Sequence, residues 1–162
     1  MVKKRYNWHW ILKLALCIII CLAIGGIGSI FTVPSIDSWY SNIVKPTFNP
    51  PSWIFAPVWN ILFILMGISL YLIIKPGINK KNKPALTFFV IQLCLNLLWS
   101  ILFFYLHSPF NAFIDILLLW IAILMTIVTS WKISKAASYL LIPYILWVSF
   151  ATLLNYYIMI LN

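Results

Sequence analysis

Five long apolar runs constrain the fold of this chain more than any other feature. They cover roughly residues 10–31, 53–75, 85–106, 109–131 and 138–160. A helix of about 20 apolar residues crosses the hydrocarbon core of a bilayer, which is about 30 Å thick. Since the bilayer offers backbone groups no water, a spanning segment is either a helix or a strand of a closed barrel, and apolar runs without period-two alternation favour the helix. We therefore expect an all-α membrane protein, a five-transmembrane-helix bundle.

The whole chain, residues 1–162, is expected to form a single transmembrane domain with an outer loop at 32–52. The composition agrees, because 64% of the residues are hydrophobic and 8% are charged, which is far from the norm of soluble proteins. The basic N-terminal flank resembles that of a secretory signal, but the apolar run after it is longer than a signal core and no small-residue cleavage site follows. We interpret this run as a retained first span.

The basic residues lie almost entirely in alternate links, and this pattern predicts an orientation. The N-terminal region (Lys3, Lys4, Arg5 and Lys13), the second link and the fourth link hold all but one of the 11 lysines and arginines, and the exception is Lys45 in the first link. The positive-inside rule places the N-terminus in the cytoplasm and the C-terminus and first loop outside, in a bacterial plasma membrane. Bases confined to short links do not form the basic face of a nucleic-acid-binding protein, so we expect no nucleic-acid partner.

The sequence lacks the residue groups of conventional enzymes and metal sites. Its three cysteines lie inside apolar runs without metal-binding spacing, and only two histidines occur. There is no nucleophile motif and no phosphate-binding glycine loop. Asp115 is the only acidic residue within a span, and we interpret it as a tie between helices more readily than as a proton carrier. Conventional catalysis, a metal site and a resident cofactor are therefore not expected.

Three of the expected helices present a face that mixes aromatic rings with amide or small side chains, at the spacing of a helix with a 3.6-residue period. These residues are Gln92, Asn96, Trp99, Ser100 and Phe103 on the third helix, Trp59 and Phe63 on the second, and Trp147, Ala151 and Asn155 on the fifth. Such faces can line a cavity. They can equally hold helices together through hydrogen bonds and close packing.

The tryptophans fall into two groups by their depth in the spans. Trp131 and the tryptophans near the N-terminus lie beside basic residues at span ends, as in an interfacial belt. Trp59, Trp99 and Trp147 lie about 7–12 residues inside their spans, which is roughly 10–18 Å of helix at 1.5 Å per residue. Ligand contact and core packing remain alternatives for these three. If they line a cavity, their flat faces suit a planar hydrophobic ligand.

The stretch WYSNIVKPTFNPPSWIFAPVW at 39–59 joins the first two spans and is rich in proline and tryptophan. Pro46, Pro50 and Pro51 restrict the backbone and disfavour a helix before them. We therefore expect residues 39–52 to form a stiff external lid, whose ordering over a ligand costs little entropy. Residues 53–59 are expected to begin the second helix with Trp59 turned inward.

Three blocks of the sequence resemble the translocator protein family, TspO/MBR, whose bacterial members are called tryptophan-rich sensory proteins and whose eukaryotic members were known as peripheral-type benzodiazepine receptors. The first block is 39–59, which is similar to the family pattern WYxxLxKPxxxPPxWxFxPVW with Ile43 at the leucine position. The other blocks are QLCLNLLWSILFF at 92–104 and PYILWVSFATLLN at 143–155. They resemble the family patterns QLxLNxxWxxxFF and PYxxWxxxAxxLN.

The resemblance implies a bundle of five transmembrane helices, commonly dimeric, whose pocket is capped by the first loop. In this family the pocket accepts porphyrins and, in eukaryotic members, cholesterol and drugs of the benzodiazepine type. Protoporphyrin IX or haem is then the expected ligand, and the lipid bilayer and a second copy in a homodimer are the expected partners. The matching positions imply ligand contact by Trp59, Phe63, Asn96, Trp99, Phe103, Asp115, Trp147 and Ala151, with Trp39, Tyr40, Pro46 and Trp53 in the covering loop.

We expect a membrane receptor or sensor for tetrapyrroles that also promotes their light-dependent degradation. The resemblance implies this because some bacterial members degrade protoporphyrin IX with pocket tryptophans implicated, here Trp59 and Trp147. The alternatives are a transporter or facilitator of tetrapyrroles or apolar metabolites, and a regulatory scaffold whose ligand shifts contacts with a partner. The sterol-recognition pattern of animal members is incomplete at the C-terminal end, because no Lys or Arg follows Lys135. Cholesterol is therefore not expected as the physiological ligand.

Overall fold

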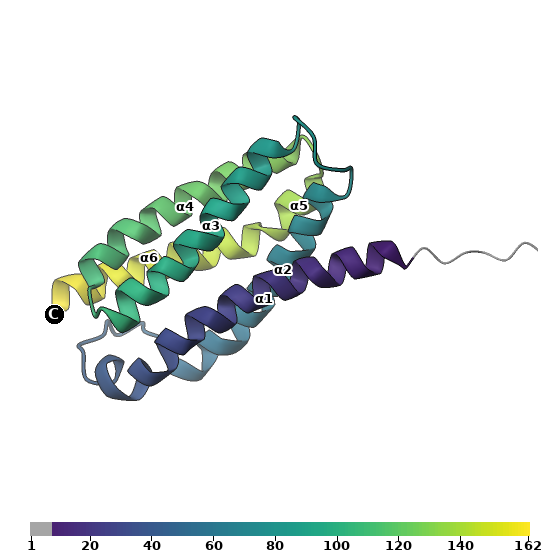
Figure 1. Ribbon diagram of the computed structural model, residues 1–162. Coiled ribbons are helices and arrows are strands. Elements are labelled where there is room, and N and C mark those ends of the chain that lie inside the picture. Colours follow the sequence, from purple (N-terminus) through teal and green to yellow (C-terminus); the bar gives the residue numbers. More distant parts are fainter. Residues whose placement is uncertain (1–7) are drawn as a thin grey trace, which may run out of the picture.

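The computed structural model describes residues 8–162, and over that range it is helical with no strand. Lys3, Lys4 and Arg5, which contribute to the predicted orientation, lie outside the described residues. Within 8–162, five helical segments are long and apolar enough to cross a membrane (Figure 1): His9–Tyr40, Ser52–Ile74, Lys83–Tyr105, Pro109–Trp131 and Lys135–Leu161. The prediction of a five-helix, multi-pass membrane protein is confirmed.

Several of these spans consist of two consecutive elements. The first span is α1 (His9–Ser35) followed by the π-helical turn η1 (Ile36–Tyr40), and the second is the short 3₁₀ turn η2 (Ser52–Ile54) followed by α2 (Phe55–Ile74). The third is α3 (Lys83–Ser100) with the π-helical turn η3 (Ile101–Tyr105), and the fourth is α4 (Pro109–Trp131) alone. The fifth is α5 (Lys135–Leu140) and α6 (Ile142–Leu161), which meet at Leu141.

The first span is longer than the sequence predicts. The expected outer loop at 32–52 is helical as far as Tyr40, because α1 continues through Pro34 and η1 follows it directly. A proline inside a helix removes one backbone hydrogen bond, but tertiary contacts hold this segment. The Ser35 hydroxyl donates to the Phe104 carbonyl oxygen at 2.6 Å, and Tyr40 is buried against Phe103. Only residues 41–51 remain as a loop.

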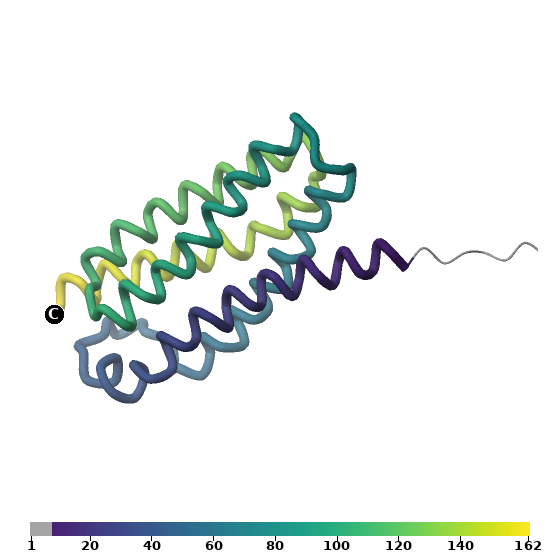
Figure 2. The backbone as a smooth tube through the Cα atoms, viewed as in Figure 1, coloured from purple at the N-terminus to yellow at the C-terminus, as the bar shows by residue number. Residues whose placement is uncertain are grey.

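Consecutive spans run antiparallel, because a short link joins the end of each span to the start of the next. Figure 2 shows α1 running along α2, while α4 lies against both α3 and α6. The C-terminus and the start of α1 lie at opposite ends of the bundle, as an odd number of spans demands (Figure 1). Loop 41–51 lies at the same end as the C-terminus, and the links after α2 and α4 lie at the other end.

Apolar packing is unequal in the two halves of the bundle. The larger cluster of buried side chains fills the half away from loop 41–51, and Met66, Ile73 and Phe89 within it are fully buried. A smaller cluster closes the end beneath the loop, and its buried members are Tyr40, Phe103, Ala112 and Ile158. The region between the two clusters is therefore where the bundle can be hollow.

We predict that Gly67→Ala lowers the free energy of unfolding by about 1–3 kcal/mol, the typical cost of overpacking. The reason is the close approach of α1 and α2, since a Cβ atom at position 67 would lie 2.5 Å from the Ile18 Cα atom. Gly26→Ala is the matched control, because nothing lies within 4 Å of a Cβ atom there. Thermal unfolding of the purified variants in detergent measures the difference. An equal unfolding temperature for the two variants would contradict this α1–α2 contact.

Candidate functional site

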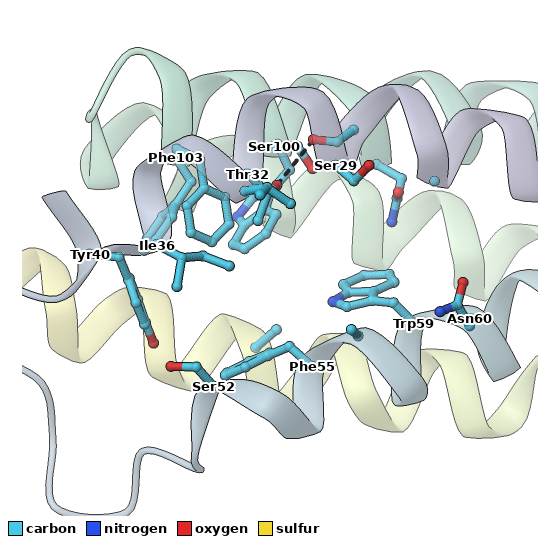
Figure 3. A pocket seen from close by; sticks show the side chains of 18 of the residues that line it. Ser29, Thr32, Ile36, Tyr40, Ser52, Phe55, Trp59, Asn60, Ser100 and Phe103 are labelled. Atoms are coloured by element: carbon cyan, nitrogen blue, oxygen red, sulfur yellow. Dashed lines mark hydrogen bonds between the residues drawn. The ribbon is translucent and has the colours of Figure 1, made fainter. Parts of the chain in front are cut away.

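A cavity of about 440 Å³ lies between α1, α2, α3 and α6, in the half of the bundle nearest loop 41–51 (Figure 3). Its volume falls within the range of small-molecule sites, about 300–1,000 Å³. The lining is mostly aromatic and aliphatic, with a few hydroxyl and amide groups, and none of the described residues that form it carries a formal charge. Such a cavity suits an apolar ligand with a few polar groups.

Most of the side chains predicted to meet a ligand come together in this cavity. The lining includes Tyr40, Trp59, Phe63, Asn96, Trp99, Phe103, Trp147 and Ala151. They come from η1, α2, α3, η3 and α6, so residues up to 111 positions apart in sequence (Tyr40 and Ala151) share one wall. Figure 3 shows Tyr40, Trp59 and Phe103 facing the same hollow. Their contact with a ligand stays a prediction.

Three loop residues predicted to cover the cavity are not part of its lining. Trp39 meets Phe103 edge to face and stacks on His107, with the Trp39 and His107 ring centroids 4.7 Å apart. Trp53 begins the second span with 72% of its surface exposed. Pro46 lies in loop 41–51 and is half-buried. The roof above the cavity is thus formed chiefly by Tyr40 from the end of the first span.

Asp115 is also outside the cavity lining, because α4 contributes no residue to it. The Asp115 side chain is 4% exposed, and neither carboxylate oxygen has a hydrogen-bond partner within the described protein. The expected tie from Asp115 to another helix is therefore absent from the described residues. Gln92 on α3 is also fully buried, and neither polar atom of its side chain has a hydrogen-bond partner within the described protein.

The aromatic rings of the cavity wall contact one another in pairs on three helices. Trp99 and Phe103 stack with centroids 5.0 Å apart and planes 17° apart. On α2, the ring centroids of Trp59 and Phe63 lie 5.8 Å apart. Trp147 on α6 meets Phe55 edge to face at 5.9 Å. Offset and edge-to-face pairs of this kind each stabilise a structure by about 0.5–1.5 kcal/mol beyond simple burial, so the rings support each other's positions.

Hydrogen bonds between helices fix two sides of the cavity. The Trp99 indole N–H donates to Asn155 Oδ1 at 3.0 Å, and Asn155 Nδ2 donates to the Pro109 carbonyl oxygen at 2.7 Å. Asn96 Nδ2 donates to the Tyr144 hydroxyl oxygen at 3.1 Å. The buried Trp147 indole N–H, in contrast, has no partner within the described protein. Of these two deep indoles, Trp99 thus has its N–H paired within the described protein, whereas Trp147 does not.

The first span supplies part of the wall that sequence reasoning missed. Small and hydroxyl side chains of α1 line the cavity: Gly25, Gly26, Gly28, Ser29 and Thr32. A Cβ atom at Gly25 would lie 2.4 Å from the Phe63 ring, so a larger residue there would displace that ring. The run GGIGS within an otherwise bulky apolar span is the signal that could have identified this wall. Ser52 and Asn60, at the start of the second span, were also missed.

The end of α6 holds loop 41–51 through a paired contact between an amide side chain and the backbone. The Val44 N–H donates to Asn162 Oδ1 at 3.0 Å, and Asn162 Nδ2 donates to the Val44 carbonyl oxygen at 3.0 Å. Asn162 Nδ2 also donates to the Ile158 carbonyl oxygen at 2.8 Å. Because Ile158 lines the cavity, the contact joins the loop to the cavity wall.

Aromatic contacts fasten the same loop at a second point. Phe48 meets Tyr157 edge to face with centroids 5.3 Å apart, and it lies 6.4 Å from Phe150. On the side of the first span, the Tyr40 hydroxyl donates to Asn49 Oδ1 at 2.8 Å. The loop is therefore attached both to η1 and to α6, and its role as a lid over a ligand stays a prediction.

Comparison with known proteins matches most of the chain to one protein family. The sequence profile of the TspO/MBR family matches residues 17–161. The tryptophan-rich protein TspO of Chlorobaculum tepidum is 49% identical over 153 residues, covering 94% of this chain and 97% of the relative. The human translocator protein is 36% identical and covers 80% and 78%, respectively. The tryptophan-rich sensory protein of Cereibacter sphaeroides is 32% identical and covers 78% of each.

We predict that Asn162→Ala increases hydrogen–deuterium exchange of the Val44 amide about tenfold. Two hydrogen bonds are lost, each contributing about 0.5–1.5 kcal/mol, and 1.4 kcal/mol corresponds to a tenfold change. Exchange is followed by mass spectrometry of peptides that cover residues 41–51. Asn111→Ala is the control, because Asn111 Nδ2 donates only to the nearby Ser108 hydroxyl at 2.9 Å. Equal exchange in the two variants would show that Asn162 does not hold the loop.

Proposed function

The chain belongs to the TspO/MBR family of membrane proteins, and from this membership and its cavity we propose that it is a membrane receptor for tetrapyrroles, with protoporphyrin IX or haem as ligand. One observation carries the proposal, which is the uncharged cavity walled by aromatic rings from several spans. Relatives of the chain bear the names sensory protein and translocator protein. A sensing role fits a cavity whose lining, within the described residues, carries no charged residue and no conventional catalytic group.

The lining matches the chemistry of a porphyrin macrocycle. A porphyrin is flat and largely apolar, and its π-system stacks favourably on aromatic faces. Trp59, Trp99 and Trp147 reach the cavity from three different helices, so a planar ligand would meet indole rings on several sides. The amide of Asn96 is a polar group of the lining that would orient it.

We also propose that the cavity opens toward the outer face of the membrane. Lys45 is the one lysine at the cavity end among the described residues, whereas Lys13 and the lysines of the second and fourth links lie at the opposite end. Positive residues stay on the cytoplasmic side. The ligand would then enter from outside or from the outer half of the bilayer.

Light-dependent degradation of the porphyrin is the chemistry that we assign to the deep tryptophans. One electron passes from the indole of Trp59 or Trp147 to the light-excited porphyrin and then to dioxygen, which becomes superoxide. The oxidised indole passes its N–H proton to superoxide, which leaves a neutral indolyl radical and a hydroperoxyl radical, and the hydroperoxyl radical is the oxidant that attacks the macrocycle. No acid–base pair is needed for these steps, in agreement with the uncharged lining.

Transport of tetrapyrroles is the alternative function. A transporter needs a route from the cavity to the opposite end of the bundle. That half is filled by the larger apolar cluster, including the fully buried Met66, Ile73 and Phe89. The receptor function therefore fits this packing better than transport does. Protein-dependent flux of protoporphyrin across proteoliposomes would reverse this preference.

We predict saturable quenching of tryptophan fluorescence when the purified protein is titrated with protoporphyrin IX. Trp147→Phe should weaken binding about two- to tenfold, the equivalent of one aromatic contact of about 0.5–1.5 kcal/mol. Trp131→Phe is the control, because Trp131 lies at the far end of the bundle and outside the cavity lining. Absence of saturation in the unmodified protein would refute porphyrin binding.

We predict that illumination bleaches bound protoporphyrin more slowly in Trp147→Phe than in the unmodified protein, because phenylalanine is a poorer electron donor than indole. The absorbance of the pigment is followed at ligand concentrations that saturate each variant, so that weaker binding does not enter the comparison. Trp131→Phe, a dark sample and free pigment are the controls. Equal bleaching in the two variants would remove Trp147 from the photochemistry while leaving ligand binding intact.

A further inference from the structure

The end of the bundle opposite the cavity is strongly and uniformly basic. Seven exposed lysines lie there among the described residues: Lys13, Lys75, Lys80, Lys81, Lys83, Lys132 and Lys135. The chain has two acidic residues in all. Asp37 lies in η1 at the cavity end, and Asp115 lies within α4 on the cavity half. These lysines, called the basic end below, therefore have no carboxylate partner at their own end.

The link between α2 and α3 is held in one shape at the basic end. Asn82 is 1% exposed, and its Nδ2 donates to the carbonyl oxygens of Ile73 at 3.0 Å and Gly77 at 2.7 Å. Its Oδ1 accepts from the Asn79 N–H at 2.9 Å. Gly77 has φ of 85°, a conformation that favours glycine. The link thus presents Lys80 and Lys81 from a fixed backbone.

The second basic link lies beside the first. The Ser69 hydroxyl of α2 donates to the Ala137 carbonyl oxygen of α5 at 2.8 Å, and this bond fastens the two elements together. Lys132 and Lys135 flank the start of α5. Figure 1 shows both links at the same end of the bundle. Lysines from two separate links are therefore available to one anionic partner.

Apolar and aromatic side chains accompany the lysines. Ile78, at the tip of the α2–α3 link, is 73% exposed. Trp131 and Tyr139 are 42% and 55% exposed and meet edge to face at 5.2 Å, and the Lys135 ammonium lies 5.8 Å from the Trp131 ring centroid. Exposed tryptophan and tyrosine at span ends mark the headgroup level of a bilayer. The basic end therefore lies at the membrane surface.

We propose that the basic end binds the headgroups of anionic phospholipids, of which phosphatidylglycerol is an example. The ends of five spans keep these lysines at headgroup level, where each basic residue near an anionic surface raises affinity about fivefold. A lipid satisfies both features of the surface, because its phosphate pairs with lysines while its glycerol and acyl region contact Ile78 and Trp131. The phosphate backbone of a nucleic acid would pair with the lysines but offers no acyl chain to Ile78 and Trp131. This inference is independent of what the cavity binds.

Native mass spectrometry of the full chain from micelles with equal phosphatidylglycerol and phosphatidylcholine tests the proposal. We expect the protein to retain more phosphatidylglycerol than phosphatidylcholine. The ratio of the two retained lipids should be roughly fivefold smaller in Lys80→Gln and in Lys81→Gln. Lys45→Gln removes one lysine at the cavity end and should keep the full preference. No preference in the unmodified protein, or the same loss in Lys45→Gln as in the basic-end variants, would overturn the proposal.

Two further arms distinguish the lipid from other anions. Thermal unfolding in detergent is measured with added phosphatidylglycerol, inorganic phosphate or a single-stranded oligonucleotide, each at equal phosphate concentration. We expect stabilisation by phosphatidylglycerol alone, diminished at 1 M salt, where charge interactions are screened within about 3 Å. Equal stabilisation by inorganic phosphate would identify a general anion effect, and greater stabilisation by the oligonucleotide would identify nucleic acid as the partner. Either result would overturn the lipid proposal.

Discussion

The absence of water inside a bilayer is the constraint on which the rest of this structure depends. Backbone groups must be paired within each span, and a buried polar side chain without a partner is costly. Several polar residues of the inner faces bond across helices, as in the path from Trp99 through Asn155 to Pro109 and in the contact of Asn96 with Tyr144, whereas Gln92 and Asp115 have no partner among the described residues. These bonds stabilise the bundle and at the same time set the positions of the cavity walls.

The cavity itself results from an uneven distribution of side-chain size. In the half of the bundle near the basic end, large residues such as Met66, Ile73 and Phe89 are fully buried and fill the interior. In the other half, Gly25, Gly26 and Gly28 let α1 approach without filling the interior, and aromatic rings from α2, α3 and α6 surround the remaining volume. The rings are supported by one another and by hydrogen bonds at their edges, so the hollow is present without a ligand. Preorganisation of this kind lowers the entropic cost of binding.

The two ends of the bundle are specialised in different ways. At the cavity end, loop 41–51 is attached to α6 by Asn162 and Phe48 and to the first span by Tyr40. At the basic end, the α2–α3 link is fixed by the single buried side chain of Asn82. A fixed loop at one end and a fixed basic link at the other are thus built on one bundle. In both, an amide side chain pairs with backbone groups and fixes the link.

The sequence by itself determined the number of spans and the bounds of the fourth span at 109–131. It also determined the separation of lysines from the cavity end and the aromatic stripe of α3. These features are predictable because hydropathy and helical period act locally. Tertiary structure decided the rest. Only packing against Phe103 and Phe104 carries the first span through Pro34 to Tyr40, and only the rotation of each helix relative to its neighbours brings Gly25 into the cavity and leaves Asp115 outside it. The pairing of Val44 with Asn162, 118 residues apart, has no local signature. Periodicity defines which residues share a face, but contacts between distant helices determine what that face meets.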